Sequence, residues 1–271
     1  MSQLDIYWAA HLGCSPIHLR DGGHHVVARP SDADGTPPPW PLRCGPVALV
    51  TTGAGWVLSV PADMTERAAS LCTRLTFGQL VAQGDRLSQQ WFDGGAYENP
   101  NMKRAESDAA YSVMNDRVSG ISLRGWSHYV LSYADAPVTK VEDSPHVQRI
   151  SPDQSDIWDQ FREWPSPMCG PNICKHFPVS DAFGYILDGK LVSVAQLEAR
   201  PEELEWEYGV YTLPDYRGRG FATAVLRSVT AYIAQQGHVP WHYTDHYNRP
   251  SRKLPKKLGY FQYGEGLFSA V

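Results

Sequence analysis

The stretch YTLPDYRGRGFATAVL, residues 211–226, decides how the second half of the chain folds. Its first residues end a run typical of a β-strand, and its last residues have the spacing of an amphipathic helix. Between them stands an Arg/Gly-rich turn, so a strand passes directly into a helix. The N–H groups that begin a helix have no partner inside it, and together with the helix dipole they attract an anion. The sequence therefore predicts an anion-binding corner.

The turn itself favours a large phosphate-containing ligand. Gly218 and Gly220 lack Cβ atoms and let the backbone approach a diphosphate closely, while Arg217 and Arg219 add positive charge. Two common phosphate motifs are excluded here. The chain has no GxxxxGK[ST] loop, and the turn lacks the third glycine and the downstream βα unit of a dinucleotide-binding fingerprint.

The flanking segments predict an α/β fold with a mixed sheet. Two apolar runs surround Asp188-Gly189-Lys190, and Asp-Gly is a strong hairpin signal. Helical spacing is found in three segments, at 151–164, 223–236 and 249–258, and strands are expected at 147–150, 182–187, 191–199, 204–213 and 240–247 and in the tail after Gly259. This order lacks the regular alternation of a doubly wound nucleotide-binding fold.

The first half of the chain is predicted to be a separate unit. The runs PVALVTT and GWVLSV read as a hairpin, followed by a helix within 62–75 and a strand at 126–133, whereas the proline-rich segment 29–46 reads as a loop. A polar segment at 135–146 indicates a domain boundary near Pro145. We therefore expect an N-terminal domain at 1–145 and a C-terminal domain at 146–271.

Composition excludes several classes of protein. The formal net charge of the 271 residues is -5 and the isoelectric point is about 6.0, which is unlike a general nucleic-acid binder. The N-terminus lacks a basic region, and no apolar run is long enough to span a membrane. Five scattered cysteines favour reduced thiols in a cytoplasm over a disulfide framework. The sequence does not indicate an oligomeric state.

Two groups of potential metal ligands are interpreted as structural residues and not as metal sites. Cys169 and Cys174, with His176 close by, are spaced more widely than a CxxC pair, and no second cysteine pair is present to complete a zinc site. His242 and His246 share one face of a strand but lack the glutamate of an HExxH helix. We expect incidental thiols and packed or rim histidines, and no metal.

The motifs resemble those of the GNAT superfamily of acyltransferases. Residues 217–222, RGRGFA, resemble its (Q/R)xxGx(G/A) pyrophosphate signature. Asn248, Ser251, Leu254 and the run KLGY at 257–260 resemble the segment that closes the same fold. The resemblance covers roughly residues 182–260 and is most similar to a bacterial branch with an extra N-terminal domain. An ordinary Gly-rich corner between a strand and a helix is the alternative.

This resemblance implies an acyl-CoA site between two splayed strands. The pantetheine arm would pair with backbone groups at Val210, Tyr211 and Thr212. The diphosphate would rest on residues 217–222, and the implied cofactor-binding residues are Arg217, Gly218, Arg219, Gly220, Phe221, Ala222, Asn248 and Ser251. The implied reaction moves an acetyl or other acyl group from coenzyme A to an amine of a small molecule, by direct attack in a ternary complex.

The attacking amine must lose a proton, and the strand before the turn offers carboxylates for this task. Glu203, Glu205 and Glu207 alternate onto one face, and Glu207 is nearest the expected thioester, so Glu207 is our candidate base; a solvated acidic face is the alternative. Many GNAT enzymes place a tyrosine seven positions after the Asn as general acid. Pro255 stands there, so Tyr247, His246, Ser251 or solvent would have to supply the proton.

Two other functions remain open, and both depend on the segment 249–258. Five basic residues in this predicted helix allow an aminoacyl-tRNA-dependent transferase on a GNAT scaffold, although the acidic net charge makes a tRNA partner unlikely. Pro255 allows a non-catalytic acyl-CoA sensor. For the N-terminal half, we hypothesise a degenerate GNAT-like domain that shapes the acceptor cleft.

Overall fold

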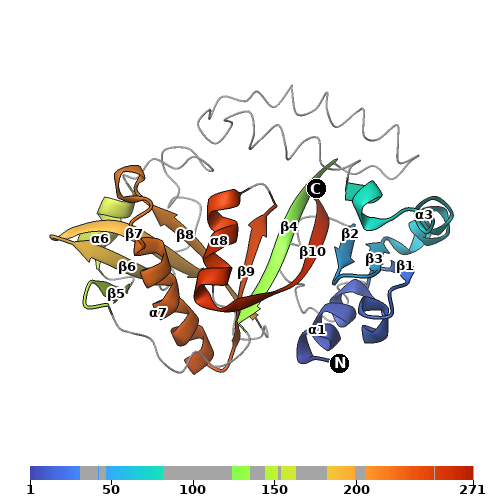
Figure 1. The fold of residues 1–271 in the computed structure, drawn as a ribbon, viewed down its shortest axis with the longest axis horizontal. Coiled ribbons are helices and arrows are strands. Elements are labelled where there is room, and N and C mark those ends of the chain that lie inside the picture. The colour runs from blue at the N-terminus through green and yellow to red at the C-terminus, as the bar shows by residue number, and fades with distance from the viewer. Residues whose placement is uncertain are drawn as a thin grey trace.

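A mixed sheet runs through the whole molecule (Figure 1). This computed structural model describes residues 1–30, 42, 47–81, 124–134, 144–151, 154–162, 182–198, 205–246 and 248–270. In these parts the helices and strands are α1 (Gln3–Leu12), η1 (Pro16–Leu19), β1 (His24–Ala28), β2 (Ala48–Thr51), β3 (Trp56–Val60), η3 (Ala62–Met64), α3 (Thr65–Cys72), β4 (Arg124–Ala134), β5 (Val147–Ile150), α6 (Ser155–Arg162), β6 (Ala182–Leu187), β7 (Lys190–Glu198), β8 (Glu205–Thr212), η5 (Pro214–Tyr216), α7 (Phe221–Gln235), β9 (Val239–Asp245), α8 (Arg249–Leu258) and β10 (Tyr260–Ala270).

The strand order shows that the two halves of the chain are interleaved. The order is β1-β3-β2-β10-β4-β9-β8-β7-β6-β5. Strand β4 precedes the predicted domain boundary, yet it pairs on one edge with β9 and on the other with β10, both antiparallel. In Figure 1 these three strands cross the middle of the molecule, with β5–β8 on one side and β1–β3 on the other. The predicted boundary near Pro145 thus divides the chain but not the sheet, and the two-domain division remains a prediction.

Strands β8 and β9 run parallel and then part. Their ladder consists of Glu205 opposite Val239 and Trp206 opposite Pro240. Beyond these pairs β8 continues to Thr212 along β7, while β9 continues to Asp245 along β4. Within the described parts of the chain, each strand is therefore paired on its outer edge only from this point, and the two strands separate toward the ends at which both finish.

Helix α7 packs across the sheet beside this separation. Its side chains Val225, Leu226, Val229 and Ile233 are fully buried against Ala195 and Leu197 of β7 and neighbouring residues. Burial of one such aliphatic side chain stabilises the folded state by about 1.5–3 kcal/mol, so these four side chains hold α7 firmly against the sheet. In Figure 1, α7 crosses the half of the sheet that contains β6 and β7.

The N-terminal helix joins the start of the chain to its last strand. Ser2 and Asp5 form a capping box at the beginning of α1. Asp5 is buried, and its Oδ1 accepts hydrogen bonds from Arg20 and from the Tyr263 hydroxyl of β10. Burial raises the pKa of Asp5, but these hydrogen bonds outweigh it and the pKa is lowered overall.

Most elements expected from the sequence are confirmed. The hairpins β2–β3 and β6–β7 form, and the latter turns through Asp188 and Gly189, both at positive φ. Helix α7 begins two residues earlier than expected, at Phe221, because the turn glycine itself occupies the N-cap position. The tail forms a single strand, β10, and the helix α1 and strand β1 were not anticipated. Residues 31–41 and 43–46 of the expected proline-rich loop lie outside the described residues.

Among the described residues, no helix has the length and hydropathy that crossing a bilayer requires. Two of the five cysteines, Cys14 and Cys72, are described, and both are free thiols. Burial raises the pKa of Cys14 to about 11, which keeps this thiol protonated and unreactive at neutral pH. Cys44, Cys169 and Cys174 lie outside the described residues.

The contact between Trp8 and Tyr133 provides a test of this interleaved core. Both side chains are fully buried, and the indole Nε1 donates to the Tyr133 hydroxyl at 2.7 Å. Tyr133→Phe keeps the ring but leaves the indole N–H without its acceptor, so we expect the free energy of unfolding to fall by about 1–3 kcal/mol. Urea denaturation measures the change. In a double-mutant cycle with Trp8→Phe, the double variant should lose less than the sum of the single variants, and strict additivity would contradict the contact.

Candidate functional site

The turn between β8 and α7 has the backbone geometry of an anion-binding corner. After η5, Arg217 is extended, and Gly218 and Gly220 adopt φ of 76° and 90°. L-residues rarely adopt such values, so glycine is required at both positions. Gly220 is the N-cap of α7, and its carbonyl accepts from Ala224 N–H at 3.0 Å. Ala224 N–H thus makes the first hydrogen bond of the helix, and the N–H groups of residues 221–223 are not part of the helical ladder.

The space above the turn is open. A Cβ placed on Gly218 or Gly220 would meet no atom within 4 Å. Both glycines are exposed, and the same openness is found at Gly209, which lies on β8 beyond its ladder with β9. The glycines are thus required by conformation and not by crowding, and the corner can accommodate a bulky group.

The two arginines of the turn are exposed and each lies over aromatic rings. Arg217 donates from Nε to the Thr212 carbonyl at 3.1 Å, and its guanidinium lies 5.5 Å from the Tyr211 ring centroid. Arg219 lies 4.9 Å from the centroid of Phe221. These contacts hold two positive charges beside the helix N-terminus, where they reinforce its attraction for an anion.

Other predicted cofactor-binding residues have structural roles. Phe221 is buried against Tyr185, so only its backbone faces the corner, and Ala222 is half-buried. Val210 packs toward α7, whereas Tyr211 packs on the opposite side of the sheet. This alternation leaves the main chain of β8 as the part that can meet a ligand in the separation from β9.

Asn248 and Ser251 are brought together at the start of α8. The Asn248 side chain caps the helix by accepting from Ser251 N–H at 3.2 Å. The Ser251 hydroxyl lies 3.1 Å from Nε2 of His242, which also lies 2.6 Å from Thr244 Oγ1. These side chains therefore join α8 to β9. Pro255 is buried within the same helix.

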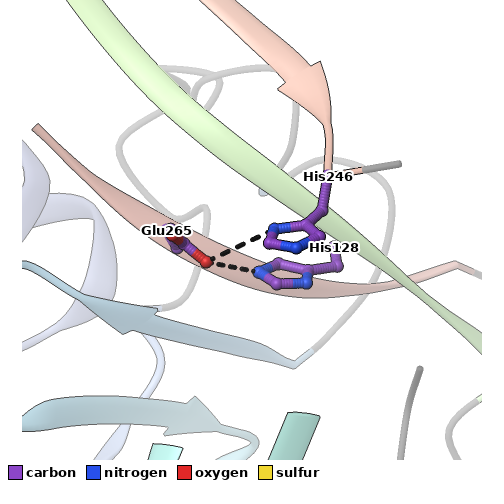
Figure 2. Close-up of side chains that lie close together, drawn as sticks. All are labelled: His128, His246 and Glu265. Carbon is purple, nitrogen blue, oxygen red and sulfur yellow. Dashed lines mark hydrogen bonds and ion pairs between the residues drawn. The ribbon is translucent and has the colours of Figure 1, made fainter. Parts of the chain in front are cut away.

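Of the predicted catalytic residues, His246 has a described side chain and Glu207 and Tyr247 do not. Glu207 lies in β8 opposite Glu198, one residue past the last pair with β9, but its side chain is outside the described part, as are Glu203 and Tyr247. His246 follows β9 directly. Its Nδ1 lies 3.6 Å from Glu265 Oε2, and its ring stacks on that of His128 at 4.2 Å (Figure 2).

Sequence reasoning missed His128 and Glu265. His128 lies in a strand before the predicted boundary, and Glu265 lies in the tail, so no local motif links them to His246. The alternation of β4 does place His128 on one face with Val130. Nothing in the sequence indicates, however, that β4 lies between β9 and β10.

Comparisons with known proteins concern mainly the second half of the chain. Residues 146–260, under half of the chain, match the sequence model described as Acetyltransferase (GNAT) family. The comparison with curated proteins gave no match.

Solved structures that are similar to this chain include three proteins described as GNAT or GCN5-related. A GNAT-family protein from Novosphingobium aromaticivorans is 26% identical, with a TM-score of 0.42 and coverage of 54% of this chain and 66% of that one. A GCN5-related N-acetyltransferase-like protein from Streptococcus suis is 22% identical, with a TM-score of 0.41 and coverage of 60% and 68%. A tandem GNAT protein from the clavulanic acid biosynthesis pathway is 12% identical, with a TM-score of 0.42 and coverage of 59% and 57%. The chain thus spans just under two thirds of the first of these.

His242, which links β9 to α8, is expected to make the stability of the protein depend on pH. Burial lowers the pKa of His242 from 6.5 to about 4, so the ring is neutral at pH 7. Because the unfolded chain binds the proton more readily, the free energy of unfolding should fall as pH falls from 6.5 toward 4, by up to about 3 kcal/mol. Urea denaturation across this range measures the fall. His242→Gln should flatten this part of the curve, and parallel curves for the two proteins would contradict the assignment.

Proposed function

We propose that the protein transfers an acyl group from acetyl-CoA or another acyl-CoA to an amine of a small molecule, which the match of residues 146–260 to the GNAT acetyltransferase family supports. The observation that carries this proposal is the combination of two features along β8. The strand has no ladder with β9 beyond Trp206, and its far end leads into the open glycine corner at the start of α7. A long thioester carrier with a diphosphate needs both a slot and an anion site.

The described residues fit such a carrier. Main-chain N–H groups at residues 218–223, with Arg217 and Arg219 beside them, would hold the diphosphate. The main chain of β8 at Val210, Tyr211 and Thr212, beyond the two pairs with β9, would pair with the amides of the pantetheine arm. When bound, acyl-CoA supplies the activated thioester; an N–H of β8 would stabilise the oxyanion that forms as the amine attacks.

Glu207 is the residue we assign as general base. Its position on β8 is the first after the ladder with β9 ends, so it stands where the separation begins. A carboxylate there can take a proton from the incoming ammonium group, directly or through a water molecule, and leave a free amine to attack. Glu205 shares its side of the strand but lies within the ladder, opposite Val239.

The general acid that would protonate the departing thiolate is not the tyrosine used by many GNAT enzymes, because Pro255 occupies that position. We propose Tyr247, next to the end of β9, with His246 as the alternative and solvent as the remaining source. A thiolate is a tolerable leaving group, so transfer does not require a dedicated acid. We place this activity in the cytoplasm, consistent with the free thiols of Cys14 and Cys72.

A non-catalytic acyl-CoA sensor is the second candidate, and Pro255 is the observation that favours it. An enzyme and a sensor share the binding site but differ in thiol release. Thiol release from acyl-CoA in the presence of an amine panel therefore separates the two functions, and binding without release would support the sensor.

Gly220→Asp tests the carrier site. The new side chain would be strained at φ 90° and would place a negative charge in the corner, so we expect acyl-CoA affinity to fall at least about tenfold, measured by calorimetry. Gly237→Asp is a matched control, because Gly237 has φ 84°, has open space and lies at the other end of α7. Equal affinities for Gly220→Asp and the unmodified protein would remove the corner as the binding site.

Glu207→Gln tests the base. We expect turnover to fall about a hundredfold or more, with the largest effect below the pKa of the acceptor amine, where the base is needed. Thiol release as a function of pH measures this, and Glu205→Gln serves as the control on the same side of the strand. A pH–rate profile with unchanged shape in Glu207→Gln would exclude this residue as base while leaving acyl transfer intact.

A further inference from the structure

Three potential metal ligands from distant parts of the chain converge at one point of the sheet. Among the described residues, one ligand atom each from His128, His246 and Glu265 lie within 4.8 Å of one another. His128 belongs to β4, Glu265 to β10, and His246 directly follows β9, so each of three adjacent strands contributes one side chain (Figure 2).

The sheet register fixes this convergence. Tyr129 pairs with Asp245, and the next position is closed by the bond from His246 N–H to the His128 carbonyl at 2.7 Å. Val130 pairs with Glu265, which puts Glu265 diagonally across from His128 on the same face. Arg252 of α8 binds the His246 carbonyl at 2.9 Å and adds a further restraint. The three side chains are thus positioned by main-chain bonds.

The donor atoms have separations that suit a small tetrahedral cation. His128 Nε2 lies 2.8 Å from Glu265 Oε2, and His246 Nδ1 lies 3.6 Å from the same oxygen. Ligands about 2.0–2.1 Å from a zinc ion at tetrahedral angles stand about 3.3 Å apart. The two observed separations lie on either side of this value. Because the rings of His128 and His246 are stacked, with planes 10° apart, binding would also require the imidazoles to rotate until their lone pairs point at one position.

The surroundings provide burial on one side and access on the other. His128 is 3% exposed and has Phe77 edge-on against its ring at 6.1 Å, while His246 and Glu265 are partly exposed. A glutamate carboxylate is ionised at neutral pH, so Glu265 beside two imidazoles offers a divalent cation a charged ligand.

We propose that His128, His246 and Glu265 bind a divalent transition-metal ion of the zinc class. Two imidazoles and one carboxylate are ligands that zinc prefers, and three protein ligands leave one position for water or another small group. The hard cations Ca²⁺ and Mg²⁺ require more oxygen ligands than this site has. The ion would tie β9, β4 and β10 together at the end where β9 has parted from β8. This proposal does not depend on acyl transfer.

Zinc binding by the full chain tests the proposal. After treatment with a chelator and dialysis, we expect the protein to take up about one equivalent of zinc, to resist displacement by excess Mg²⁺, and to give the visible absorption of low-coordinate Co²⁺ when cobalt replaces zinc. Glu265→Gln and His128→Gln should each lower zinc affinity by at least about tenfold, measured against a chromophoric chelator.

His25→Gln is the matched control. His25 also bonds a carboxylate, Asp21, at 2.9 Å and stacks on another imidazole, His18, at 4.1 Å, but it lies away from the three ligands. Its removal should leave zinc affinity unchanged. If His128→Gln does not fold, Glu265→Gln decides alone, because that side chain is partly exposed. Absence of stoichiometric uptake, unchanged affinity in Glu265→Gln, or an equal loss in His25→Gln overturns the proposal.

Discussion

The placement of β4 between β9 and β10 is the constraint on which the rest of the structure depends. A strand that leaves its neighbour exposes unpaired main-chain groups along that edge, and such an edge is stable only if the other edge is well held. Strand β9 leaves β8 after Pro240, and from Trp241 to Asp245 it is paired with β4. The separation that makes room for a ligand is therefore supported by a strand from the first half of the chain.

The same arrangement connects the two candidate sites without merging them. The glycine corner and the separation lie on the β8 side of β9, whereas His128, His246 and Glu265 lie on the side of β4 and β10. Strand β9 is common to both, since it borders the separation and His246 directly follows its last residue, Asp245. A restraint on the end of β9 is therefore also a restraint on one border of the separation, so this strand connects the histidine cluster to the proposed acyl-CoA site.

The parts of the fold that sequence analysis predicted are those set by local chemistry. Asp188-Gly189 specifies a hairpin, and a strand followed by Gly218 and Gly220 specifies the corner, because positive φ values are a local requirement. The position of β4 depends on pairing across more than a hundred residues, which no short pattern encodes. His128 and Glu265 went unrecognised for that reason, whereas Glu207 was selected from alternation along one strand.

The source of protons in the proposed reaction depends on the environments of His242, in β9, and of His246, which follows this strand. His242 has a pKa lowered to about 4 by burial, so at neutral pH it carries no proton that it could give up as a general acid. His246 directs Nδ1 toward Glu265 and stacks on His128, which orients the ring toward β4 and β10 and away from β8. With Pro255 in place of a phenol, His242 is excluded as the donor, and His246 would have to turn away from Glu265 to reach a thiolate in the separation. We therefore keep Tyr247 as the proposed donor, with His246 and solvent as the alternatives, and the proposed acceleration would come from positioning, from the oxyanion contact and from removal of the amine proton.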